Sequence, residues 1–244
     1  MESQTAAAPE TPQPKGALWR LQGIFFEPSA TFEDINLRPD FIVPLVAAMV
    51  ITFVTWQLLS HFVDLQEVLM TQIRNSPQAA NASPEQLRTG LNFQLIILKY
   101  LVPVLVPIMA LIYAGVFMLM VWISGSETTF SKLLSSVSYT VFFQTLVGYV
   151  LLLVVFALAQ DPNSINLQNP VFTNPAPLVN AKTSPVLYSL LSSVDIVSFY
   201  VIFLFGLGIS KVSRRMSTGK GVTLVAIPFL IYVAIKVGIT ALTT

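Results

Sequence analysis

The chain has 244 residues and a formal net charge of +1, with 54% hydrophobic residues, only 10% charged residues and a mean hydropathy of +0.72. A soluble domain is about 25% charged, so this chain has too few charges to cover a water-facing surface. Its near-neutral charge argues against a nucleic-acid partner. Because cysteine is absent, disulfides, thiolate catalysis and iron–sulfur ligation are excluded.

The first 40 residues precede any membrane span. Residues 1–15 are polar and lack the charged-then-apolar pattern of a signal peptide, so we expect a disordered cytoplasmic tail and a first span that serves as the targeting signal. Residues 16–39 carry apolar side chains at helical spacing, with Arg20 on the polar side. This pattern predicts a short amphipathic helix in the cytoplasmic interface. Pro28 interrupts it, and a second short helix or turn follows.

Residues 40–244 are predicted to form one all-α domain, a polytopic five-helix transmembrane bundle. A helix needs about 20 apolar residues to cross the ~30 Å hydrocarbon core of a bilayer. Each span is expected to be helical, because a lone lipid-facing strand would leave its backbone groups unpaired. The five apolar windows are residues 41–60, 95–123, 137–159, 190–210 and 221–242.

The distribution of positive charge predicts the orientation of these spans. Lys211, Arg214, Arg215 and Lys220 lie in one loop without an acidic residue, and the positive-inside rule places this loop in the cytoplasm. Counting spans back puts the N-terminus and the loop 124–134 on the same side, which then holds eight of the 13 basic residues. The C-terminus is expected outside. We expect the four basic residues to attract anionic lipid headgroups.

The outer loops are longer and poor in Lys and Arg. Residues 161–185 contain five prolines, which predicts an irregular segment rather than a folded domain. Ser83 followed by Pro84 is typical of a helix start.

Two charged residues, Asp195 and Lys236, lie well inside predicted spans. Such charges cost about 2.5–3.5 kcal/mol each on insertion scales. Each lies 16 residues from the basic loop, on adjacent antiparallel helices, and thus ~24 Å from the cytoplasmic end at the same depth. The simplest interpretation is an ion pair that fixes the fourth helix against the fifth. A proton or ion relay is the alternative, and the structural pair is favoured because no further ionisable groups line a path.

Small residues and one amide predict where helices pack closely. Two pairs of small residues, each spaced by four, allow backbones to approach, and homodimer formation is the alternative use of such pairs. Gln144 is expected to bond to a neighbouring helix. The predicted packing residues are Ala110, Ala114, Gln144, Gly148, Gly206 and Ser210.

Three prolines inside spans, Pro103, Pro107 and Pro228, each remove a backbone hydrogen bond and predict helix kinks. Transporters use broken helices at binding sites, but membrane helices also tolerate proline generally. We therefore favour kinks without a substrate.

No catalytic residue, metal or cofactor is expected. The GxSxG, HExxH, Walker A and GxGxxG motifs are absent. Gly206-Leu207-Gly208 is followed by Ile209, where an intramembrane aspartyl protease would need Asp. His61 with Asp64 is too small a set for a metal site. An intramembrane hydrolase is therefore disfavoured.

Several short motifs, in this order, resemble the Yip family of membrane proteins, named for interaction with Ypt/Rab GTPases, in its bacterial branch. The motifs are the pre-span stretch 24–32 (IFFEPSATF), Pro44, Gly125 with Thr129-Phe130, the stretch 195–200 (DIVSFY), Gly206-Leu207-Gly208 and the basic loop. The resemblance covers residues 19–242. It implies a five-helix bundle with a cytosolic N-terminus and a C-terminus on the far side, which agrees with the orientation that charge predicts.

Eukaryotic members of this family look like adaptors in vesicle traffic, but the short N-terminal region here looks prokaryotic, so Rab binding is not transferred. We expect a non-enzymatic scaffold or membrane-organising protein of the bacterial inner membrane. Its expected partners are the lipid bilayer, including anionic lipids, and other membrane proteins or a second copy of the chain. A small transporter or channel subunit that uses the intramembrane charges is the alternative.

Overall fold

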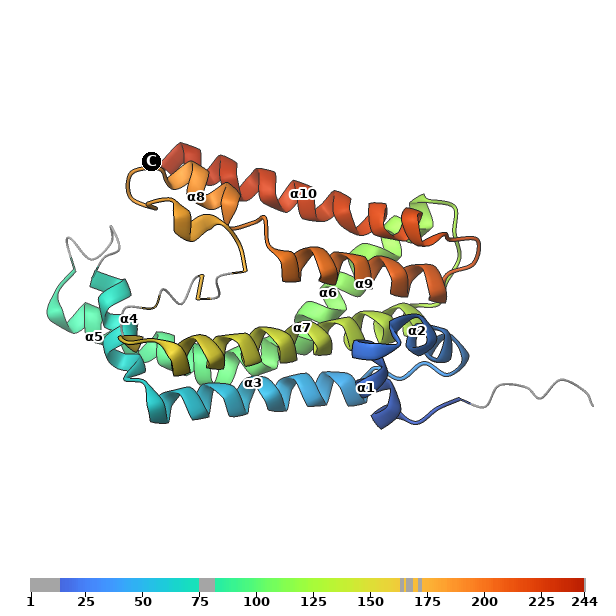
Figure 1. Ribbon diagram of the computed structural model, residues 1–244, viewed down its shortest axis with the longest axis horizontal. Helices are drawn as coiled ribbons and strands as arrows, with labels where there is room; N and C mark the ends of the chain where they lie inside the picture. Colours follow the sequence, from blue (N-terminus) through green and yellow to red (C-terminus); the bar gives the residue numbers. More distant parts are fainter. Residues whose placement is uncertain (1–13, 75–81, 163–164, 166–168, 171–172, 244) are drawn as a thin grey trace, which may run out of the picture.

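The computed structural model describes residues 14–74, 82–162, 165, 169–170 and 173–243. In this part of the chain the regular structure is helical, with one isolated bridge between Glu127 and Arg214 and no strand (Figure 1). The helical segments, of which η2 is a π-helix and η4 a 3-10 helix, are α1 Ala17–Phe26, α2 Pro28–Leu37, α3 Ile42–Phe62, α4 Leu65–Arg74, α5 Pro84–Ile96, η2 Ile97–Leu101, α6 Val102–Ile123, α7 Phe130–Leu158, η4 Ala176–Leu178, α8 Pro185–Leu191, α9 Ile196–Val212 and α10 Thr218–Thr243.

Four of these helices are long and apolar enough to cross a membrane: α3, the continuous run α5–η2–α6, α7 and α10. A fifth span is formed when α8 and α9 are taken together, although they are bent by 46° at a short break. The all-α polytopic fold predicted from hydropathy is therefore confirmed. The prediction of an uninterrupted fourth helix is wrong, because the carboxylate of Asp195 accepts a hydrogen bond from the Ser198 backbone N–H at 2.8 Å and starts a new helix there.

Different helices and loops lie at the two ends of the bundle (Figure 1). The α1–α2 hairpin lies at one end, together with the α6–α7 and α9–α10 loops. The α4–α5 hairpin, α8 and the end of α10 lie at the other. Between them α7 is central and contacts α3, α6 and α9, while α10 packs along α9 and α8.

The third span begins earlier than predicted, at Phe130 rather than residue 137. The Thr129 side chain caps it by accepting from the Lys132 N–H at 3.4 Å. The polar run that follows stays helical because the Ser135 and Ser138 hydroxyls each donate to the carbonyl one turn back, at 2.7 Å. The loop between the second and third spans is correspondingly shorter than expected.

Helix α9 is contacted closely on two sides, and each contact uses a glycine. A Cβ on Gly206 would lie 2.5 Å from the Val222 Cα of α10, and a Cβ on Gly221 would clash with the Gly206 carbonyl. A Cβ on Gly208 would clash with the Ser136 hydroxyl of α7 and lie 2.9 Å from the Phe32 ring of α2. The Gly-Leu-Gly motif therefore lets the α9 backbone touch the α10 backbone and lets side chains of α7 and α2 pack directly against it.

Candidate functional site

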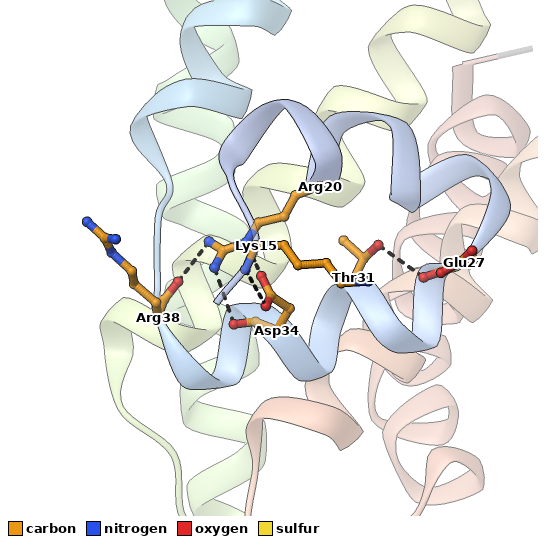
Figure 2. A network of polar contacts seen from close by, with 6 residues as sticks. All are labelled: Lys15, Arg20, Glu27, Thr31, Asp34 and Arg38. Atoms are coloured by element: carbon orange, nitrogen blue, oxygen red, sulfur yellow. Dashed lines mark hydrogen bonds and ion pairs between the residues drawn. The ribbon is translucent and has the colours of Figure 1, made fainter. Parts of the chain in front are cut away.

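The α1–α2 hairpin is fastened by a buried charge network (Figure 2). The Arg20 Nε donates to the Asp34 Oδ2 at 2.6 Å, and its two terminal nitrogens donate to the carbonyls of Arg38, at 2.8 Å, and Asp34, at 3.3 Å. The Lys15 backbone N–H donates to the other Asp34 carboxylate oxygen at 2.8 Å. Arg20 is only 2% exposed, so its expected place on a polar helix face was wrong: the chain folds back at Pro28 and brings α2 over it.

The hairpin is also part of the bundle core rather than a separate surface helix. Ile24, Phe32 and Ile35 are fully buried in the main apolar cluster. Two side chains from the bundle reach back to α2: the Lys132 Nζ donates to the Asn36 amide oxygen at 2.7 Å, and the Lys211 Nζ pairs with Glu33 at 2.5 Å. The hairpin is thus fixed to both α7 and α9.

The basic loop after α9 is held to the loop before α7. The Arg214 N–H donates to the Glu127 carbonyl at 2.8 Å, and the side chains of the two residues pair at 3.5 Å while both stay largely exposed. The Lys220 Nζ donates to the Ser124 carbonyl at 2.8 Å. Of the four predicted headgroup-binding cations, only Arg215, which has a positive φ of 56°, makes no side-chain bond within the described residues.

Asp195 and Lys236 have separate partners, which corrects the predicted direct ion pair. The Lys236 Nζ donates to the Ser192 Oγ at 2.8 Å and the Ser193 Oγ at 3.1 Å, across from α10 to the break between α8 and α9. Asp195 instead caps α9 and accepts from the Thr173 hydroxyl. Both residues contact the same short break between α8 and α9, where serine hydroxyls rather than a carboxylate solvate the ammonium. Their common depth in the membrane stays a prediction.

The predicted packing residues divide into two groups. Ala110 and Ala114 are fully buried on α6, and Gly206 and Ser210 lie in the α9–α10 contact, where the Ser210 hydroxyl is 3.3 Å from that of Thr218. The other two do not pack as expected. Gln144 is exposed and forms no hydrogen bond to the described residues, and a Cβ on Gly148 would meet nothing within 4 Å.

The three span prolines lie within or at the start of helices that continue past them. Pro103 stands in the first turn of α6, directly after the π-helical turn Ile97–Leu101. Pro107 lies inside α6 and Pro228 inside α10. The kinks expected at Pro107 and Pro228 stay predictions.

The sequence analysis missed the buried Arg20–Asp34 pair and the run of buried hydroxyl residues on α7. The run comprises Ser135, Ser136, Ser138, Tyr139 and Thr140. Ser135 and Ser136 lie between the predicted loop 124–134 and the predicted span 137–159, and the burial of the hydroxyl residues at the start of that span was not predicted. Within the described residues, no three His, Asp or Glu side chains gather closely enough to hold a metal ion.

These features define the class of the protein as a helical polytopic membrane protein with four helices long and apolar enough to cross a membrane and one bent helix pair, α8–α9. The Yip1 domain model matches residues 23–239, which is most of the chain, and the chain therefore belongs to the Yip1 domain family. No curated protein and no solved structure gave a match.

The structure gives each family-like motif a place in the fold. The stretch 24–32 forms the turn of the α1–α2 hairpin, where a Cβ on Gly23, just before it, would clash with the Thr31 hydroxyl. Gly125 has a φ of 71°, in the left-handed region that favours glycine. Thr129 and Asp195 are helix caps. These motifs therefore serve as turns, helix caps and close helix contacts.

Proposed function

We propose that the protein is a non-enzymatic membrane scaffold that uses the end carrying the α1–α2 hairpin as its docking face. The observation that carries the proposal is that three segments distant in sequence are fastened into one surface. Lys211 joins α9 to α2, Lys132 joins α7 to α2, and Arg214 joins the α9–α10 loop to Glu127. A rigid surface built from several segments suits a partner that contacts all of these segments at once.

The charge of this face supports its orientation toward the cytoplasm. Among the described residues it holds eight basic side chains and five acidic ones, which are Glu27, Glu33, Asp34, Asp40 and Glu127. Arg214 is 82% exposed at the side chain, so its pairing with Glu127 leaves it accessible to anionic headgroups, each basic residue contributing about 1 kcal/mol near such a surface. We propose a bacterial inner-membrane protein with the N-terminus inside and the C-terminus outside.

The apolar rim of the same face supports contact with lipid. Leu18 and Phe26 of α1 are 78% and 84% exposed, and Trp122 at the end of α6 is 74% exposed. Large apolar side chains this exposed are expected where a helix lies at the membrane boundary. The hairpin is thus anchored by its buried face to the bundle and by its outer face to the bilayer.

The test combines in-cell crosslinking, purification in mild detergent and mass spectrometry of what co-purifies. A stoichiometric membrane or cytosolic partner whose crosslinks map to the docking face is expected. The paired substitution Arg214→Gln and Arg215→Gln is expected to weaken retention of anionic lipid and to disturb orientation in a reporter fusion, whereas Lys182→Gln at the opposite end leaves both unchanged. A homogeneous protein without a partner, with the double variant behaving as wild type, would refute the proposal.

The broken fourth span favours a second candidate, a small transporter or channel subunit. Lys236 lies opposite a helix break lined by Ser192 and Ser193, and intramembrane charges together with broken helices are features of transport sites. Liposome flux of Asp195→Asn and Lys236→Met separates the two functions. Variants that stay folded but lose flux support transport. If the residues are purely structural, their separate partners predict additive losses of stability and no flux in the wild type.

A further inference from the structure

At the end opposite the docking face, a pocket of about 480 Å³ lies where α3 turns into α4. It is lined by Ser60, His61 and Asp64 at this turn and by Lys99 on the facing π-helical segment, together with apolar residues such as Leu95. A second pocket of about 530 Å³ adjoins it, since Asp64 and Gln66 line both. This region belongs to neither function proposed above.

The π-helical turn that carries Lys99 has a physical cause in the sequence. Pro103 has no N–H, and its ring excludes the carbonyl four residues earlier, which is that of Lys99. The turn widens by one residue instead, and the Val102 N–H donates to the Ile97 carbonyl. Single π-helical turns inside α-helices occur often at functional sites, and here the widened turn places Lys99 on the pocket wall.

The pocket lies at the membrane boundary. From Lys99 to the end of α6 at Ile123 the helix rises about 36 Å, slightly more than the ~30 Å hydrocarbon core. Phe62 at the pocket and Phe93 and Ile96 on the neighbouring turns of α5 are 79%, 63% and 57% exposed, as expected for apolar side chains in the interfacial layer of a membrane. A ligand in this pocket would therefore sit at headgroup depth with lipid tails beside it.

The pocket is lined by side chains of opposite charge that do not form an ion pair with each other. Lys99 and Asp64 line the same space, but the ion pairs among the described residues do not include them. Lys99 and His61 form no hydrogen bond with the described protein atoms. One Asp64 oxygen is occupied by the Gln66 and Glu67 backbone N–H groups, at 3.0 and 3.2 Å. The other oxygen accepts from none of the described groups and stays available to a donor.

We propose that this pocket binds the headgroup of a zwitterionic phospholipid with a primary ammonium, of the phosphatidylethanolamine class. The phosphate lies at Lys99 and His61, and the ammonium donates to Asp64. Charge-assisted hydrogen bonds of both signs select this headgroup. A purely anionic headgroup meets the repulsion of Asp64, and a quaternary choline has no N–H to donate.

The experiment measures which lipids the full-length protein retains from mixed micelles, by native mass spectrometry. Phosphatidylethanolamine, phosphatidylcholine, phosphatidylglycerol and water-soluble phosphoethanolamine are offered in turn. Lys99→Gln and Asp64→Asn are the test variants, and Asn keeps the cap of α4 because it is as good an N-cap as Asp. The matched controls are Lys182→Gln and Glu85→Gln, exposed residues of the same end that line neither pocket.

The expected result is preferential retention of phosphatidylethanolamine that falls about ten- to a hundredfold in each test variant, as the loss of one charge-assisted hydrogen bond implies, and not in the controls. Weak binding of phosphoethanolamine alone fits a lipid site, because the acyl contacts are then missing. Equal retention of all lipids overturns the proposal. A preference for phosphatidylglycerol that depends on Lys99 but not on Asp64 also overturns the proposal. The proposal is overturned as well if lipid retention across the variants correlates with their thermal stability rather than with the charge that each variant removes.

Discussion

Removing the Arg20 side chain should destabilise the α1–α2 hairpin. In Arg20→Met, the Asp34 carboxylate, 8% exposed, keeps only the Lys15 N–H, and the Arg38 carbonyl loses its donor. Breaking a buried pair by removing one partner costs about 3–5 kcal/mol. Since every 1.4 kcal/mol is a factor of about ten in an equilibrium constant, amide hydrogen exchange across α1 and α2 should accelerate by roughly two to four orders of magnitude.

The double variant Arg20→Met with Asp34→Leu should be less destabilised than Arg20→Met alone, because no unpaired carboxylate is left inside. Arg38→Met is the matched control: it removes a cation from the same hairpin, but only its backbone carbonyl joins the network, and its side chain points away from Asp34 (Figure 2). Unchanged exchange in Arg20→Met, or a double variant worse than the single one, would refute the structural account of this pair.

Two further predictions concern helix contacts and surface charge. Gly221→Ala should lower thermal stability in detergent markedly, because its Cβ meets the Gly206 carbonyl, whereas Gly238→Ala, where a Cβ meets nothing within 4 Å, should be neutral or slightly stabilising; equal effects would contradict the close α9–α10 contact. Lys211→Gln should cost at most about 1 kcal/mol of stability, since its pair with Glu33 is partly exposed, and a larger loss measured by thermal unfolding would show that this pair is more than a surface contact.

The sequence predicted the all-α polytopic fold well, because hydropathy over about 20 residues depends on composition alone, and four of the five predicted spans coincide with single long apolar helices or helical runs. The cap at Ser83 is confirmed: its hydroxyl accepts from the Gln86 N–H at 3.2 Å, and its own N–H donates to the Gln86 side chain at 2.8 Å. Pro28 marks the turn between the two pre-span helices as expected. These features depend on residues close together in the sequence, so the sequence alone can predict them.

The break in the fourth span and the burial of Arg20 could not be predicted in the same way. A hydropathy window averages over Asp195 and its neighbouring serines, so a bent pair of helices reads as one. Arg20 finds its partner 14 residues away across a hairpin, which depends on how the helices fold together. The predicted Asp195–Lys236 pair had the depth of both residues as its only basis. Depth did not reveal that the serine hydroxyls lie nearer to the lysine. The orientation and domain limits stay predictions.

The two serine hydroxyls that accept hydrogen bonds from Lys236 also bear on how the chain inserts into the bilayer. An unsolvated lysine at this depth would oppose insertion of the last helix by about 2.5–3.5 kcal/mol. Its two acceptors, Ser192 and Ser193, precede it by more than 40 residues, so they leave the ribosome first. The glycine contact between α9 and α10 brings the last helix against a neighbour that was synthesised before it. The order of synthesis thus delivers the hydroxyls to the membrane before the charge that needs them.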